Sequence, residues 1–461
     1  MSSASKVLLV FPRAFEPNTV PPLGISLLAA CLRDAGHEVD LLDLTVEPLR
    51  RREFDQYCLV GMTLLCTNFK SGTELAKQIR RDTSSVCIVA GGPFADSCPA
   101  DVLDTGVFDI VAHGEGELLL PQLVAALKSA TDYGDIGGVS FYRDGKIIRT
   151  PSQPMIAGLD ALPFPAYELL PMKHYLRHSV MASRGCPWDC IFCDRGPAES
   201  RRVRFLSPEH VRDWATRMVR DFGYKPIRIL DSTFTANQRW AERICDLIIE
   251  QGVRISWHCQ SRIDCLNPGL LKKMRDSGCT QIMAGIDSGN DEILSLSKKG
   301  LTRAEARRGA QLFRDGKGPK LHLNFVIGHP WDTLESIQET VEFADELERD
   351  FGAKCGFYMM VPFPGTELAD NAPKYEIQIK KDWEKYNKLS FMRTPERLSA
   401  TFDSKYLRVE DLTQIYHAIF QRKRRGRGAL LGQSQVPRAR PSWSSTSIQH
   451  VVRIPRVNVA S

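Results

Sequence analysis

Short apolar segments that alternate with amphipathic ones are the feature that most constrains how this chain can fold. In the first third, the apolar segments have the length of buried strands, and the segments between them repeat apolar residues with the period of a helix. Strands separated by helices run parallel and are joined by crossovers, so this part predicts a doubly wound parallel α/β sheet. Its expected strands are residues 6–11, 38–44, 59–64, 86–90 and 109–112.

A second α/β run begins near residue 180. Its six expected strands, with amphipathic helices between them, are fewer than the eight of a closed (β/α)8 barrel. We therefore expect an open, partial (β/α)6 TIM-type barrel. The expected strands are residues 179–183, 227–230, 254–258, 281–285, 321–327 and 356–361.

Turns and compositional shifts divide the chain into five expected parts. A hairpin is expected at 135–149, and the proline-rich stretch 151–171 indicates a linker. The last residues are rich in Ser, Pro and Arg and carry no packing pattern. The expected parts are a doubly wound unit at 1–145, a linker at 146–175, the partial barrel at 176–375, a helical segment at 376–425 and a disordered basic tail at 426–461.

Composition and charge indicate the cellular compartment and exclude some classes of binding partner. Of 461 residues, 43% are hydrophobic and 25% charged, and no apolar run reaches the length of a membrane-spanning helix, so no membrane partner is expected. The first residues are polar and do not form a signal peptide, which predicts a cytoplasmic protein. Thirteen cysteines then indicate thiols rather than disulfides. The basic run 421–427 has no interleaved aromatic residues, so no nucleic-acid partner is expected.

Three cysteines lie on one short stretch directly after an expected strand. Cys186, Cys190 and Cys193 have the spacing C-x3-C-x2-C. Ferredoxin-type clusters are held by four cysteines, so three thiolates leave one iron of a [4Fe-4S] cluster open to bind another molecule. A structural zinc site needs four ligands from paired motifs, and the chain has no second C-x2-C. The stretch therefore predicts an iron-sulfur cluster with an open iron.

This loop, together with the barrel pattern, resembles the radical S-adenosylmethionine (SAM) superfamily. The resemblance implies that the open iron chelates SAM and that the reduced cluster cleaves SAM to a 5'-deoxyadenosyl radical. It also implies that Phe192, the aromatic residue before the third cysteine, borders the adenine. Asp287 stands where the family carries a glutamate, so its reach is shorter. The further residues that the resemblance assigns to SAM are Asp231, Ser232, Ser261, Arg262, Gly285, Asp287, Ser288 and Ile327.

The segment 21–39 resembles the start of the cobalamin-binding-like domain that one large branch of radical SAM enzymes carries before the barrel. Glycines there let backbone approach a flat ring system. The chain lacks the Asp-x-His-x-x-Gly loop of methionine-synthase-type domains, and His37 and His113 stand in other contexts. Phe94 stands where relatives often have histidine, so we expect cobalamin without a histidine ligand. The residues assigned to cobalamin are Pro22, Gly24, Gly91, Gly92, Gly114 and Gly116.

These motifs favour cobalamin-dependent methyl transfer to a small molecule in natural-product biosynthesis. A [4Fe-4S] cluster, SAM and cobalamin are the expected cofactors, and flavodoxin or ferredoxin the expected reductant. The alternative is a radical dehydratase or epimerase acting on an aminosugar-type substrate without cobalamin. An iron-sulfur electron carrier would explain the cluster but not the SAM-like segments. Tyr224, Tyr358 and Cys355 are candidates to give a proton or hydrogen atom, although buried core positions explain them better.

Overall fold

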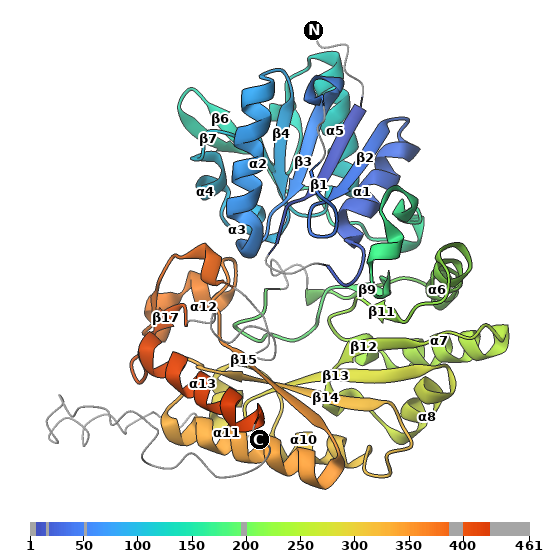
Figure 1. Cartoon of the computed structure of the whole chain (residues 1–461), viewed down its shortest axis with the longest axis vertical. Helices are drawn as coiled ribbons and strands as arrows, with labels where there is room; N and C mark the ends of the chain where they lie inside the picture. The colour runs from blue at the N-terminus through green and yellow to red at the C-terminus, as the bar shows by residue number, and fades with distance from the viewer. Residues whose placement is uncertain (1–5, 15–17, 50–52, 195–200, 387–399, 425–461) are drawn as a thin grey trace, which may run out of the picture.

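The computed structural model describes residues 6–14, 18–49, 53–194, 201–386 and 400–424. Two α/β units lie one above the other, and the C-terminal segment lies beside the second unit and reaches toward the first (Figure 1). The expected basic tail at 426–461 lies outside the described residues.

The first unit is built on a seven-stranded sheet in the order β2-β1-β3-β4-β5-β6-β7. The first five strands run parallel, and the last two form an antiparallel hairpin at one edge, so the predicted doubly wound sheet is confirmed. The sheet extends four residues past the expected boundary at 145. The strands are β1 (Lys6–Phe11), β2 (Glu38–Asp43), β3 (Tyr57–Thr63), β4 (Cys87–Gly91), β5 (Ile110–Ala112), β6 (Val139–Arg143) and β7 (Lys146–Arg149).

Helices cover both faces of this sheet. α1 (Leu23–Asp34) and α5 (Gly116–Ser129) bury their apolar sides in the larger core. On the other face, α2 (Phe69–Asp82), α3 (Pro93–Ser97) and α4 (Pro99–Leu103) bury theirs in a second core. The carboxyl ends of the parallel strands face the second unit (Figure 1), which is where ligands bind in sheets of this kind.

The second unit is a six-stranded, all-parallel sheet in the order β15-β14-β13-β12-β11-β8. Within the described residues its edge strands β8 and β15 do not pair, so the predicted open barrel is confirmed. Its strands are β8 (His178–Val180), β11 (Ile227–Ile229), β12 (Trp257–Ser261), β13 (Cys279–Asp287), β14 (Lys320–Ile327) and β15 (Lys354–Met359). Its main helices are α6 (Pro208–Phe222), α7 (Gln238–Gln251), α8 (Pro268–Asp276), α10 (Arg303–Gln311) and α11 (Leu334–Phe351).

The third barrel strand differs from its predicted position. It was expected at 254–258 but is β12 (Trp257–Ser261). Gly252 ends α7 in the left-handed conformation (φ +67°), and the following residues carry the chain back to the sheet, so pairing starts only at Trp257.

The expected linker packs against both units. The hydroxyl groups of Tyr167 and Ser179 lie 2.9 Å apart, and the Tyr175 hydroxyl donates a 2.9 Å hydrogen bond to Asp43. Apolar residues of the first sheet, the linker and the barrel share one continuous core. These contacts hold the carboxyl edge of the first sheet against the barrel.

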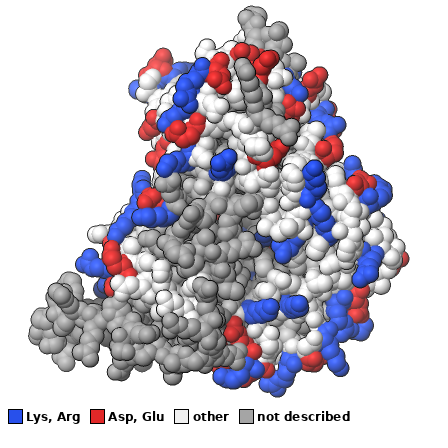
Figure 2. Space-filling view, in the orientation of Figure 1, with Lys and Arg blue, Asp and Glu red and all other residues white. Residues whose placement is uncertain are grey.

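The C-terminal segment joins the two units a second time. Trp383 packs edge-on against Phe94 of α3, with ring centroids 5.1 Å apart. α13 (Val409–Arg424) places Leu412 against the backbone of Gly328 at the end of β14. On the face drawn in Figure 2, basic and acidic side chains are interspersed over both units. No helix within the described residues is long and apolar enough to span a membrane.

Candidate active site

The three motif cysteines lie on a loop that leaves a short antiparallel hairpin, β9 (Ser183–Arg184) with β10 (Arg204–Phe205). Gly185 starts the loop with φ +96°, and the Cys193 amide donates to the Cys190 carbonyl over 3.2 Å. All three thiols are partly buried and none is in a disulfide. Within the described residues no three Cys, His, Asp or Glu side chains already converge on one metal position. The donor set nevertheless fits the cluster, because three soft thiol ligands stand on one turn.

Basic side chains lie beside this loop. The Arg262 guanidinium lies 4.6 Å from the centre of the Trp188 ring within the loop and donates 2.7 Å hydrogen bonds to the carbonyls of Lys299 and Gly300. Burial raises the pKa of the Cys190 thiol, while the charges of Lys299 and Arg262 act to lower it. Both cations also pair with carboxylates, Arg262 with Asp264 at 2.8 Å and Lys299 with Asp287.

Lys299 is a site residue that the sequence analysis missed. Its ammonium lies 2.6 Å from the Asp287 carboxylate, and each side chain is only 9% exposed. Burial alone would lower the pKa of Lys299, but Asp287 raises it overall. A side chain at Gly285 would come within 3.2 Å of the Lys299 ammonium, so the glycine leaves room for this pair. A lysine in a Lys-Lys-Gly run gives no sequence signal of burial.

Asp231 supports the start of the cluster loop. Its carboxylate accepts hydrogen bonds from the amides of Ala182 and Ser183, at 3.1 and 2.9 Å, and from the Ser183 hydroxyl at 2.9 Å. Burial raises the pKa of Asp231 to about 6 against the opposing effect of these hydrogen bonds. Both oxygens are therefore engaged within the protein, whereas Ser232, its neighbour in the predicted SAM set, is exposed.

The two buried serines predicted to contact SAM form hydrogen bonds within the protein. The Ser261 hydroxyl is buried and hydrogen-bonds to the Thr235 hydroxyl. The Ser288 hydroxyl lies 3.2 Å from that of Thr340 on α11 and accepts the Asn290 amide. Both residues remain predictions as SAM contacts.

The aromatic residue of the loop lies at the end of β14. The Phe192 ring lies edge-on to His329, 5.6 Å between centroids, and packs in the same apolar cluster as Val326. Ile327 instead lies in the main core, on the opposite side of the strand from Val326, and it stays a prediction as an adenine contact. His329, which the sequence analysis also missed, is 1% exposed, and its two ring nitrogens form no hydrogen bond within the described part of the chain.

The turns assigned to cobalamin follow the strands of the first sheet. Gly92 has φ +90°, and a side chain there would meet the Leu64 carbonyl at 3.0 Å, so the fold itself requires glycine. A side chain at Gly116 would similarly meet Leu28 at 3.0 Å, and one at Gly91 would approach Ala112 only at 4.0 Å. A side chain at Gly24 or at Gly114 would meet no other atom within 4 Å.

The two histidines that the sequence analysis set aside as cobalt ligands both have side-chain neighbours in the structure. The ring nitrogens of buried His113 lie 2.8 Å from Asp96 and 2.8 Å from Ser140, so both are engaged inside the first unit. His37 lies on the surface beside Lys128. Pro22 precedes α1, and its carbonyl accepts the Ser26 hydroxyl at 2.9 Å.

A buried ionic network joins the turn after β5 to the cluster loop. The Arg184 guanidinium, two residues before Cys186, donates to Glu115 at 2.8 Å and also to Glu117. Arg204, which pairs with Arg184 across the hairpin, donates to both Glu115 oxygens at 2.8 and 2.9 Å. The sequence analysis noted this turn for its glycines, whereas the structure uses its glutamates to tie the two units together.

The three candidates to give a proton or hydrogen atom lie in three different environments. Tyr224 is 54% exposed in the loop before β11, so the expected core position is wrong for it. Cys355 is buried and its thiol donates to the Ala344 carbonyl of α11 over 3.4 Å, which places it on the helix-facing side. Tyr358 lies on the opposite side of β15, which faces the barrel interior.

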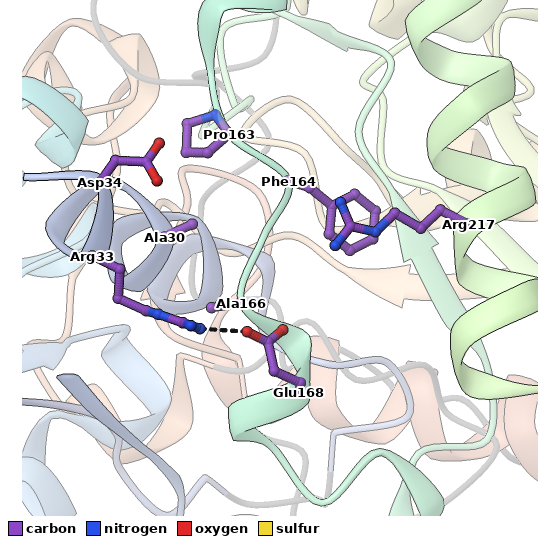
Figure 3. A pocket seen from close by; sticks show the side chains of 8 residues that line it. All are labelled: Ala30, Arg33, Asp34, Pro163, Phe164, Ala166, Glu168 and Arg217. Atoms are coloured by element: carbon purple, nitrogen blue, oxygen red, sulfur yellow. Dashed lines mark hydrogen bonds and ion pairs between the residues drawn. The ribbon is translucent and has the colours of Figure 1, made fainter. Parts of the chain in front are cut away.

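A surface hollow between the two units lies away from these residues (Figure 3). It is formed by the last turn of α1, the linker and α6. The Arg33 guanidinium pairs with Glu168 across it, and the Arg217 guanidinium lies 3.8 Å from the centre of the Phe164 ring. No predicted site residue lines this hollow.

Replacing Glu115 by glutamine should lower the free energy of unfolding at pH 7 by about 3 kcal/mol, because it leaves the largely buried Arg204 guanidinium without its carboxylate partner and Arg184 with Glu117 alone. Burial alone would raise the pKa of Glu115, but hydrogen bonds from Arg204 and Arg184 lower it from 4.5 to about 2. This stabilisation is present above pH 4.5 and is lost as the pH falls toward 2, so E115Q and the parent should converge in acid.

Urea unfolding of the cluster-free protein between pH 7 and pH 3 measures this difference. Glu168→Gln is the matched control, because the Arg33–Glu168 pair also joins the two units but is about half exposed. It should change the free energy by less than ~1 kcal/mol. Equal effects of the two substitutions would contradict a specific role for the buried network.

Two family models match the chain. The radical SAM superfamily model matches residues 180–344, and the B12 binding domain model matches residues 16–124. An uncharacterized methyltransferase of Pyrococcus horikoshii is 31% identical over 87% of this chain and 91% of its own length. The anaerobic magnesium-protoporphyrin IX monomethyl ester cyclase of a Synechocystis strain is 28% identical over 64% of this chain and 62% of its length.

The fold is also that of a solved radical SAM methyltransferase, TsrM from Kitasatospora setae, with cobalamin and a [4Fe-4S] cluster bound. The two share 20% identity over 82% of this chain and 81% of that one, with a TM-score of 0.68. The predicted family, enzyme class and cofactors, a [4Fe-4S] cluster, SAM and cobalamin, are confirmed at the level of the family. The chain belongs to the radical SAM superfamily, to the branch that carries an N-terminal B12 binding domain.

Proposed function

We propose that the protein is a cobalamin-dependent radical SAM methyltransferase acting on a small molecule. The observation that carries the proposal is the buried network from Arg184 to Glu115 and Glu117, which binds the cluster loop to a turn of the B12-binding unit. A methyl group that passes between two cofactors requires them to be held at a fixed separation. The methyltransferase names of the Pyrococcus relative and of TsrM support the same reaction.

Each part of the chain has a distinct role in this proposal. Cys186, Cys190 and Cys193 would hold the cluster, whose chemistry is the reductive cleavage of SAM to a carbon radical. Arg262 and Lys299, each paired with a carboxylate, lie beside the loop, and Phe192 borders the adenine. Gly24, at the start of α1, and Gly114, in the turn after β5, leave open space for a corrin at the carboxyl edge of the first sheet.

The same cluster needs an external electron. We propose flavodoxin or ferredoxin as the donor and the cytoplasm as the setting. None of the thirteen cysteines, all of which the structure describes, is in a disulfide, which fits a reducing compartment.

The alternative is a dehydratase or epimerase that retains the first unit without its ligand. The Synechocystis relative, named a cyclase, indicates that related chains carry out other reactions. Purifying the protein from cells supplied with hydroxocobalamin tests the choice. Stoichiometric bound corrin, with the absorption spectrum of cobalt lacking an imidazole ligand, is the expected result. A corrin-free protein from the same cells would reject methyl transfer through cobalamin.

A further inference from the structure

The barrel interior carries a cluster of basic and polar side chains that the SAM and cobalamin residues leave unused. Along β11 to β15, alternate residues pack into the core against the helices. Their neighbours in sequence therefore face the inside of the barrel. The inward residues include Arg228, His258, His322, Asn324 and Tyr358.

Strand pairing brings these residues together. Arg228 on β11 pairs directly with His258 on β12. A side chain at Gly356 would lie 3.6 Å from both the Asn324 amide oxygen and the Tyr358 ring, so these two side chains line the same space. Arg228 interacts electrostatically with Tyr358 although three strands separate β11 from β15, because the sheet curves around the interior.

The positive charge in this space is not balanced by any carboxylate in the part of the chain that the structure describes. Within the described residues no carboxylate pairs with Arg228, and its guanidinium forms no hydrogen bond. Burial, followed by the charge of Arg177, lowers the pKa of Arg228. Burial together with Arg177, Arg228 and His322 lowers the pKa of His258 to about 4. A half-buried guanidinium that lies near a second guanidinium, that of Arg177, is unfavourable unless an anion joins it.

We propose that Arg228, with His258 and Tyr358 beside it, binds an anionic oxygen group of the substrate inside the barrel. A guanidinium matches the geometry of both phosphoryl and carboxylate groups, and the neutral imidazole of His258 offers one further donor. His258 precedes Ser261 at the carboxyl end of β12 by three residues, which is about 10 Å along the strand. A substrate anchored there would reach SAM with its opposite end. This substrate class rests on the proposed function.

Anion binding can be measured on the full-length, cluster-loaded protein without SAM, corrin or reductant. Inorganic phosphate, methylphosphonate and acetate are titrated separately by calorimetry at constant ionic strength. Arg228→Gln should weaken binding of the preferred anion by at least about tenfold, as expected for a lost charge-assisted hydrogen bond. Arg228→Lys keeps the charge and should retain part of the affinity, which guards against a folding defect in the glutamine variant.

Arg243→Gln is the matched control, because this arginine lies exposed on α7 and pairs with Glu250 at the surface. It should bind all three anions as the parent does. Tighter binding of phosphate or methylphosphonate than of acetate would support a phosphoryl or phosphonyl substrate, and the reverse order a carboxylate. Failure of all three anions to bind the parent, or equal binding by R228Q and the parent, would overturn the inference. Because SAM, corrin and reductant are absent, neither result depends on whether methyl transfer occurs.

Discussion

Replacing Cys186, Cys190 and Cys193 together by alanine should abolish both cluster binding and SAM cleavage. The three thiols stand on one loop, and no other cysteine pair has comparable spacing. A [4Fe-4S] cluster without its three thiolates has no other ligands of the required softness in this loop. Anaerobic reconstitution followed by iron and sulfide analysis measures the cluster, and chromatography of 5'-deoxyadenosine measures cleavage.

The control for this experiment changes buried cysteines outside the loop. Cys245, Cys259 and Cys279 are buried in the main core of the barrel. Alanine at each should leave the iron content unchanged. A full cluster in the triple loop variant would show that other residues hold the iron.

Lys299→Met should lower the free energy of unfolding by about 3 to 5 kcal/mol, because it leaves the Asp287 carboxylate buried without a partner. The pair is short, at 2.6 Å, and both side chains are 9% exposed. Chemical unfolding of the cluster-free protein measures the loss.

The neighbouring lysine gives a matched control. Lys298 pairs with Glu367 at 2.7 Å, but its side chain is 48% exposed, so Lys298→Met should change the stability by less than ~1 kcal/mol. Combining Lys299→Met with Asp287→Asn should recover much of the loss, because no buried charge remains. A double variant as unstable as Lys299→Met alone would contradict the ion-pair explanation.

The sequence predicted the parts of the molecule that depend on local pattern. Strand and helix periodicity placed both sheets, and the cysteine spacing identified the cluster loop, because each signal lies within a short stretch of chain. Contacts between distant segments were not predictable in this way. Glu115 and Arg184 are 69 residues apart, and nothing in either local sequence indicates that they meet.

The direction of side chains was hard to predict for a related reason. Ile327 and Val326 are both apolar and adjacent, so a one-residue difference in strand phase decides which one packs in the cluster that contains Phe192. Tyr224 precedes its strand and lies in an exposed loop, a distinction that propensity does not provide. The polar residues of β11 to β15 that face the barrel interior were not predicted, because charged and polar residues in a strand usually face solvent.

The most direct test of the proposed reaction is a count of products from SAM with a deuterated methyl group. The protein is loaded with cobalamin and reconstituted with its cluster, then supplied with a low-potential reductant and the labelled SAM. We predict that S-adenosylhomocysteine accumulates alongside 5'-deoxyadenosine and that the deuterated methyl group is recovered by mass spectrometry in the corrin fraction. 5'-Deoxyadenosine as the sole nucleoside product, with no label in the corrin, would contradict methyl transfer and favour the dehydratase or epimerase alternative.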